Sequence, residues 1–282
     1  MTLQDKIKSL IQLVIVDPNL AIRIIIKRNT RNNWLNKKEI KESFKGIVFN
    51  FDFSLSPMVK YMYTGSYEID TYLALKKFLQ PGDTFIDIGG NIGYITALGA
   101  GIVGETGEVH TFEPIKKYFN LLNNIAIDNP TYKIIPNNCA ISTVKGESTI
   151  TINSSSNIGN NSMVANSMEE AHQGVKETIK TINITDYLTE KKLSPSLIKI
   201  DTEGFELTVL ESLKPFILNN DKKPVIYCEV TPKDYIHSGK SIDDLAFFLD
   251  EVSYSAYTMN NLTKKLNVLE VKNRIDLVFK QN

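Results

Sequence analysis

Short apolar runs alternate with longer segments of helical periodicity over most of the chain. Runs rich in β-branched residues and flanked by turn residues predict strands that are buried on both faces of a sheet. We expect strands at residues 84–88, 108–113, 132–135, 197–201, 224–230, 255–259 and 274–279, and helices at 92–103, 115–128, 205–217 and 241–252. This alternation predicts an α/β fold: a seven-stranded, mostly parallel sheet with helices on both faces and an antiparallel C-terminal strand pair.

Two further segments lie between the third and fourth of these strands. Thr and Ile alternate over residues 147–152, which predicts an edge strand with one solvated face. Residues 153–166 are rich in Ser, Asn and Gly without an apolar period, so we expect a loop there. Such a loop either covers an active site or lies on the surface, and the sequence leaves both interpretations open.

A glycine-rich turn follows the first strand. It reads Asp87-Ile88-Gly89-Gly90-Asn91-Ile92-Gly93, and Glu113 ends the next strand twenty residues after Gly93. In doubly wound sheets a turn of this kind lies beside a nucleoside cofactor, and an acid at the end of the second strand accepts from ribose hydroxyls. The segment therefore predicts a nucleoside-cofactor site.

Charge around the turn indicates which cofactor it holds. There is no Lys or Arg from residue 78 to residue 115, whereas five acids fall in that segment: Asp83, Asp87, Glu105, Glu108 and Glu113. The glycine spacing also differs from G-x-G-x-x-G. An acidic surrounding repels a diphosphate and suits a sulfonium and an ammonium group, so we expect S-adenosylmethionine. A nicotinamide-dependent oxidoreductase and a turn with a purely structural role are the alternative interpretations.

At this point the chain resembles the FkbM family of S-adenosylmethionine-dependent methyltransferases. Residues 87–94 are close to that family's D-V-G-A-N-I-G-Y, and residues 198–206 are close to its I-K-I-D-V-E-G-x-E. Shorter similarities at residues 67–68, 81–83, 112–114, 138–142 and 185–188 occur in the same order. The resemblance covers roughly residues 60–235 and implies a Rossmann-like class I methyltransferase fold. We expect this domain at residues 61–282.

The resemblance also implies roles for residues at the matching positions. Asp87, Gly89, Asn91 and Gly93 would hold the methionine part of the cofactor, Glu113 would accept from its ribose, Asn138 and Cys139 would lie beside its adenine, and Glu68 would border the pocket. The chain departs from the family where members often read E-I-H-P, since it has Glu229-Val230-Thr231-Pro232. The family's histidine base is therefore absent at that place.

Asp201 and Glu203 follow a central strand, at the edge of the sheet where ligands bind. Either carboxylate could remove the proton from an acceptor hydroxyl during methyl transfer. Asp201 and Glu229 could also hold a divalent cation such as Mg²⁺. We expect Lys199 to pair with one of these acids and count it among the catalytic candidates. The alternative is that Asp201 and Glu203 only cap the following helix.

Composition limits the class of partner. The net charge of the 282 residues is zero, so we expect no nucleic-acid partner. The two cysteines, Cys139 and Cys228, fall in predicted buried strands, which indicates reduced thiols and a cytoplasmic protein. We expect an O-methyltransferase acting on a hydroxyl of a sugar, a glycan or a small secondary metabolite. A cofactor-binding module without catalytic activity is the non-enzymatic alternative.

Residues 1–60 precede the matched domain, and we expect them to form a helical extension. Apolar segments at residues 10–16 and 20–26 are interrupted by Asp17, Pro18 and Arg23, which argues against a membrane-spanning helix and a signal peptide. Basic residues follow the second segment: Lys27, Arg28, Arg31, Lys37 and Lys38. This pattern is typical of a helix at a membrane surface, of a helix that covers a sheet, and of a homodimer contact.

Overall fold

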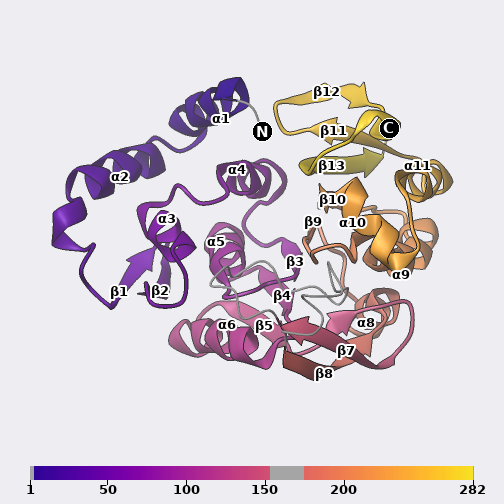
Figure 1. Cartoon of the computed structure of the whole chain (residues 1–282), viewed down its shortest axis with the longest axis horizontal. Coiled ribbons are helices and arrows are strands. Elements are labelled where there is room, and N and C mark those ends of the chain that lie inside the picture. The colour runs from indigo at the N-terminus through magenta and orange to yellow at the C-terminus, as the bar shows by residue number, and fades with distance from the viewer. Residues whose placement is uncertain (1–2, 153–174, 282) are drawn as a thin grey trace.

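The computed structural model describes residues 3–152 and 175–281 (Figure 1). Its helices are α1 Leu3–Val16, α2 Pro18–Asn29, α3 Met58–Thr64, α4 Ile69–Phe78, α5 Tyr94–Val103, α6 Lys116–Asp128, α8 Ile184–Glu190, α9 Glu206–Asn219, α10 Pro232–Tyr235 and α11 Ile242–Glu251. Its strands are β1 Glu39–Phe44, β2 Ile47–Asp52, β3 Thr84–Ile88, β4 Glu108–Phe112, β5 Lys133–Asn137, β6 Ala140–Ile141, β7 Gly146–Ile152, β8 Val175–Ile182, β9 Leu197–Ile200, β10 Val225–Val230, β11 Tyr254–Thr258, β12 Asn261–Leu266 and β13 Ile275–Gln281. The predicted loop at residues 153–166 lies outside the described residues.

The central sheet has the strand order β12-β11-β13-β10-β9-β3-β4-β5. The strands from β10 to β5 are parallel, and β13, β11 and β12 continue the sheet in antiparallel pairs. The predicted mostly parallel α/β fold with antiparallel C-terminal strands is therefore confirmed. The predicted count of seven strands is wrong, because this sheet has eight. The missed strand, β12, is a largely solvated edge strand of sequence NLTKKL, which has no apolar run.

The expected edge strand at residues 147–152 forms, but it belongs to a second sheet. β7 pairs with β8, and β8 pairs with the short β6. This sheet has its own apolar cluster: Ile115, Ala140, Ile150 and Ile179. The alternation of Thr and Ile predicted a half-buried strand correctly and left its partner undetermined.

Alternation along the strands of the central sheet divides the core into two layers. Phe85 of β3 and Leu197 of β9 pack with α4 and α5 in one cluster. Their neighbours Ile86 and Ile198 point to the other face and pack with α9 and α11. Because successive side chains of a strand alternate in direction, Asp87 and Lys199 point to the same face as Phe85 and Leu197. The two charged side chains therefore lie on the α5 side of the sheet.

The N-terminal extension is only partly helical. The helices α1 and α2 are followed by an antiparallel hairpin of β1 and β2, in which Ile47, Phe49 and Phe51 alternate with less buried residues. Leu13 and Leu20 belong to the same apolar cluster as Phe85, so the extension packs on the α5 side of the fold (Figure 1). No single helix in the described residues has the length and composition to cross a membrane; Ile7–Val16 and Pro18–Asn29 meet both criteria only as a pair, bent by 119°.

The glycine turn is shaped by packing within the protein. The N–H groups of Gly89 and Gly90 both donate to the carbonyl of Phe112, at 3.0 Å each. Gly89 has a φ of +82°, and a Cβ at this position would lie 1.8 Å from the backbone oxygen of Asp201. A Cβ at Gly93 would lie 2.4 Å from Ile125. The glycines let the end of β9 and α6 approach the turn closely.

A buried ion pair joins the central strands just below this turn. The Nζ of Lys199 lies 3.4 Å from Asp87 Oδ1 and 3.3 Å from Asp201 Oδ2, and it donates to the Gly89 carbonyl at 3.1 Å. The second oxygen of Asp87 accepts from the Thr96 hydroxyl at 2.6 Å. Lys199 therefore connects β3, β9 and the turn through one ammonium group.

Replacing Gly89 by alanine is expected to lower the free energy of unfolding by about 3 kcal/mol or more, since the added Cβ overlaps the Asp201 carbonyl and the backbone is left-handed. Gly239→Ala is the matched control, because Gly239 has a φ of +69° with nothing within 4 Å of the added Cβ. It should cost about 1–2 kcal/mol. Urea unfolding measures both, and equal losses would contradict this account of the turn.

Lys199→Met is expected to destabilise the fold by about 3–5 kcal/mol, because it leaves the fully buried Asp87 without its cation. Adding Asp87→Asn should recover part of the loss. Lys214→Met removes the partly exposed pair with Glu251 and should cost less than about 1 kcal/mol. Denaturant titration of the three variants gives the comparison; a Lys199→Met protein as stable as Lys214→Met would show that the buried pair contributes little.

Candidate functional site

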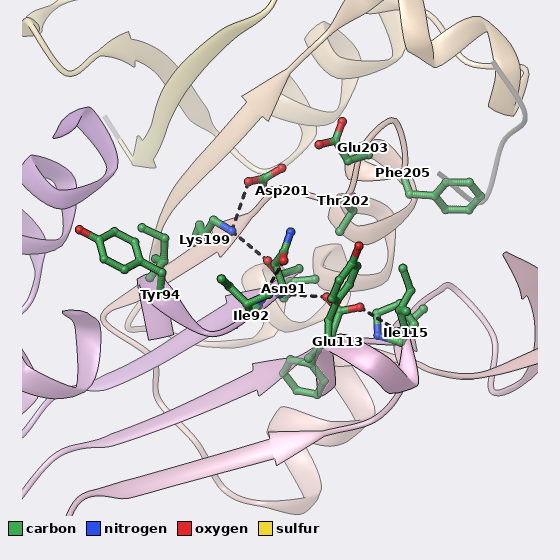
Figure 2. A pocket seen from close by; sticks show the side chains of 18 of the residues that line it. Asn91, Ile92, Tyr94, Glu113, Ile115, Lys199, Asp201, Thr202, Glu203 and Phe205 are labelled. Atoms are coloured by element: carbon green, nitrogen blue, oxygen red, sulfur yellow. Dashed lines mark hydrogen bonds and ion pairs between the residues drawn. The ribbon is translucent and has the colours of Figure 1, made fainter. Parts of the chain in front are cut away.

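A cleft opens at the carboxyl ends of β3, β4 and β9 and has an empty volume of about 1040 Å³ counted to its mouth. Eight of the residues predicted from the sequence line it: Glu68, Gly89, Asn91, Glu113, Cys139, Lys199, Asp201 and Glu203. Figure 2 shows Lys199 and Asp201 on one side of this cleft and Glu113 with Ile115 on the other. Segments far apart in the sequence thus meet at one edge of the sheet, as expected for a doubly wound fold.

The other predicted residues lie behind the lining. Asp87 is completely buried beneath the turn, where burial raises its pKa while Lys199 and Thr96 oppose that rise. Asn138 uses its amide to donate to the carbonyls of Glu113 and Pro114, both at 2.9 Å. Gly93 packs against α6. These residues shape the cleft, and the lining itself comes from their neighbours.

Glu113 is fixed by the backbone on both sides. Its Oε2 accepts from the N–H of Asn91 at 2.9 Å, and its Oε1 accepts from the N–H of Ile115 at 2.8 Å. Burial raises its pKa to about 7, although these two hydrogen bonds favour the ionised form. The carboxylate is therefore held in one orientation at the end of β4, with its remaining lone pairs available to the cleft.

Lys199 and Asp201 form a second fixed group. Burial opposes the ionisation of Asp201, but Lys199, Glu229 and Arg274 together outweigh burial and lower its pKa. Burial likewise opposes the charge of Lys199, but Asp201, Asp87 and Glu68 together outweigh burial and raise the lysine's pKa. Lys199 thus stays protonated, which suits it to hold other groups in place and excludes it as a base at neutral pH.

Three carboxylates converge beside the cleft: Asp201 and Glu203 line it, and the buried Glu229 lies next to them. One oxygen from each of the three lies within 4.8 Å of the other two. Burial and the negative charge of Asp201 raise the pKa of Glu203 to about 8 and that of Glu229 to about 10. At neutral pH the cluster therefore retains protons on two of its members.

The same cluster is the predicted site for a divalent cation. Carboxylate oxygens are suitable ligands for Mg²⁺. Arg274, however, already places its Nε 2.7 Å from Glu229 Oε1, and Thr231 donates to that oxygen at 2.9 Å. Both contacts compete with a metal for Glu229. The divalent cation stays a prediction.

The N-cap residue of α9 is Phe205, so neither Asp201 nor Glu203 is the residue that caps the helix. Glu206 instead holds the turn that precedes the helix. Its Oε1 accepts from the N–H of Thr202 and from the N–H of Gly204, each at 3.0 Å. Glu206 is almost completely buried, and burial raises its pKa. The acids that precede it are directed by the turn toward the cleft, as Figure 2 shows for Asp201 and Glu203.

Sequence reasoning missed Arg274. It precedes β13, whose first residue, Ile275, pairs with Val230 at the end of β10. An antiparallel strand starts at the edge where its parallel neighbour ends, so the order of the last strands could have placed Arg274 at the cleft. It lines the mouth with a guanidinium that is 58% exposed.

Three of the six described non-glycine residues with a positive φ lie at the cleft, and no sequence signal indicated it. Glu68, Asn91 and Glu203 have φ values of +46°, +50° and +52°, in the left-handed region that non-glycine residues seldom adopt. All three line the cleft. Such residues cluster at functional sites, where the surrounding structure holds them in place.

The lining fits S-adenosylmethionine in charge and polarity. Four carboxyl groups, from Glu68, Glu113, Asp201 and Glu203, line the cleft with two cations, from Lys199 and Arg274, and a ligand with positive groups favours the ionised form of these acids. An apolar part of the wall suits an adenine ring: Ile92, Phe112, Pro114, Cys139, Ile141 and Ile150. Burial raises the pKa of the Cys139 thiol to about 11, which indicates a packing role and no nucleophilic one.

Comparison with known proteins identifies the family of the domain. The methyltransferase FkbM domain matches residues 87–256. Among solved structures, an FkbM methyltransferase from Methylobacillus flagellatus KT is 15% identical with a TM-score of 0.44; the match covers 81% of this chain and 55% of that protein, so the chain spans little more than half its length.

Two other solved structures give similar figures. An S-adenosylmethionine-dependent O-methyltransferase from Thermotoga maritima is 10% identical with a TM-score of 0.42, over 77% of this chain and 66% of that one. A precorrin-6y C5,15-methyltransferase from Geobacter metallireducens GS-15 is 10% identical with a TM-score of 0.44, and the match covers 77% of this chain and 90% of that protein. No curated protein matches the chain.

The family match spans the glycine turn, Glu113, the strand that carries Lys199 and all three clustered acids. It decides against the nicotinamide-dependent alternative. The chain belongs to the FkbM family and is an S-adenosylmethionine-dependent methyltransferase.

Proposed function

We propose that this methyltransferase modifies a hydroxyl group of a sugar, a glycan or a small secondary metabolite. The observation that carries the proposal is the cluster of Asp201, Glu203 and Glu229, of which the first two line the cleft. A hydroxyl is a poor nucleophile until its proton is removed, and carboxylates with raised pKa values are suitable bases near neutral pH. The same oxygens can accept from further hydroxyls of a polyol, which supports a sugar-like acceptor.

Glu113 and Glu68 are the residues that would hold the cofactor's polar groups. The fixed carboxylate of Glu113 would accept from the ribose hydroxyls. Glu68 lies at the start of α4, where Thr71 donates to it at 3.1 Å, and would face the cofactor's positive end together with Asp201. The apolar wall around Cys139 would take the adenine.

Glu203 is our choice for the base. S-adenosylmethionine supplies an electrophilic methyl group, and its transfer to oxygen releases the proton of the acceptor hydroxyl. Glu203 would accept that proton, while Asp201, already paired with Lys199, would keep its charge and orientation. Arg274 would hold Glu229 in place beside them. The chain's own contribution is then to position the acceptor and move one proton.

The affinity for S-adenosylmethionine is expected to rise about tenfold between about pH 6 and pH 8, because Glu113 has a pKa of about 7 and only its ionised form accepts fully from the ribose. Isothermal titration calorimetry measures this. Glu113→Gln should bind weakly and lose the pH dependence, whereas Glu190→Gln, at an exposed acid, should keep it. Tight NAD binding without S-adenosylmethionine binding would reject the cofactor assignment. If the affinity of Glu113→Gln for S-adenosylmethionine still rose with pH as in the unmodified protein, the ribose role of Glu113 would be rejected.

The acceptor can be sought by mass spectrometry of glycans and small metabolites with and without the protein, as a gain of one methylene mass. With that acceptor, Glu203→Gln is expected to lower kcat by about 10²–10⁴-fold. It should also remove the rise in rate that accompanies ionisation of Glu203, whose pKa is about 8 in the free protein and is lowered by the bound methyl donor. Glu211→Gln, on the surface of α9, is the matched control and should leave the profile unchanged. A Glu203→Gln enzyme with wild-type kcat would exclude Glu203 as the base, and absence of turnover would favour a silent binding module.

A further inference from the structure

The outer faces of α1 and α2 carry an apolar surface that methyl transfer does not use. Eight side chains at helical spacing are between 46% and 75% exposed: Ile7, Leu10, Ile11, Val14 and Ile15 on α1, and Ile22, Ile25 and Ile26 on α2. We call these eight residues the N-terminal apolar surface. The opposite sides of the helices pack inward through Leu13, Leu20 and Ile24. Exposed apolar side chains grouped along one side of each helix are typical of an interaction site.

Basic residues surround this surface. Residues 1–38 contain eight Lys or Arg and two Asp or Glu, in a chain whose net charge is zero. Arg23 and Lys27 are paired with Glu42 and belong to the fold. Five others are exposed: Lys8, Arg28, Arg31, Lys37 and Lys38. An apolar helix face flanked by exposed cations complements a bilayer with anionic headgroups.

The surface is preformed. Arg23 donates to the carbonyl of Tyr63 in α3 at 2.7 Å, and the indole of Trp34 donates to the carbonyl of Lys27 at 2.8 Å. Figure 1 shows α1 and α2 at the outer edge of the fold, with α2 on the far side of α3 and α4 from the C-terminal strands. Two helices that meet at a bend define a plane, so both can lie along one interface. Little ordering is needed on contact, which favours binding.

We propose that the N-terminal apolar surface docks this protein on a bilayer that contains anionic lipids. The isoleucines enter the boundary between headgroups and acyl chains, and Arg28 and Arg31 contact the headgroups. A second copy of the chain suits the surface less well, because a two-fold contact would bring two strongly basic segments together. The cleft stays close to the docked helices, since α2 is bonded to α3 and Met62 of α3 lines the cleft.

Co-sedimentation of the full chain with vesicles tests the proposal. One vesicle is phosphatidylcholine alone and the other contains phosphatidylglycerol as well. Binding is expected to the second, and it should weaken as salt is raised. The double variant Ile11→Glu/Ile15→Glu should lower the partition coefficient about tenfold or more. Arg28→Glu/Arg31→Glu should lower it about fivefold or more.

Phe247→Glu is the matched control, because Phe247 is 66% exposed on α11, outside the N-terminal apolar surface. It should bind vesicles like the unmodified protein. All variants should bind S-adenosylmethionine equally, which shows that they are folded. Failure to sediment with either vesicle overturns the proposal, as does binding that Ile11→Glu/Ile15→Glu leaves intact. A dimer in analytical ultracentrifugation that this variant dissociates, without vesicle binding, would identify a second copy as the occupant.

Discussion

The Lys199 ammonium is the group on which both the sheet and the cleft depend. It contacts Asp87 on β3, Asp201 after β9 and the carbonyl of Gly89 between them. A buried charge is stable only when its partners are in place, so these three elements must form together. Their meeting point is also the floor of the cleft. The stability of the central strands and the charge of the site are therefore set by the same contacts.

The sequence predicted the centre of the fold better than its margins. β3 matches the predicted residues 84–88, because every position from Phe85 to Ile88 is buried and the run ends at a glycine turn. α5 begins at Tyr94 rather than 92, since the left-handed φ of Gly93 delays the helix. At the margins, β12 was missed and the β1–β2 hairpin was assigned to a helical extension. Edge strands and hairpins bury one face at most, so their patterns are weaker.

The site could be predicted as a set of acids and only partly as a geometry. Glu113, Asp201 and Glu203 line the cleft because they follow parallel strands, whose carboxyl ends share one edge. Asp87 lies two positions before its turn and points into the core, where Lys199 covers it. Arg274 and Glu206 were missed because their positions depend on the antiparallel return of β13 and on the turn before α9. Spacing along the chain carries no information on such contacts between distant segments.

The raised pKa values beside the cleft have a consequence for the proposed reaction. Glu203 and Glu229 retain protons because the negative charge of Asp201 and burial both oppose their ionisation. A ligand that brings positive charge to the lining lowers the pKa of nearby carboxyl groups, since each opposite charge favours the ionised form. If S-adenosylmethionine binds as we propose, its sulfonium group therefore promotes loss of the proton from Glu203. Glu203 would then become an active base only when the methyl donor is bound. Binding of the donor and removal of the acceptor's proton would be coupled through electrostatics alone.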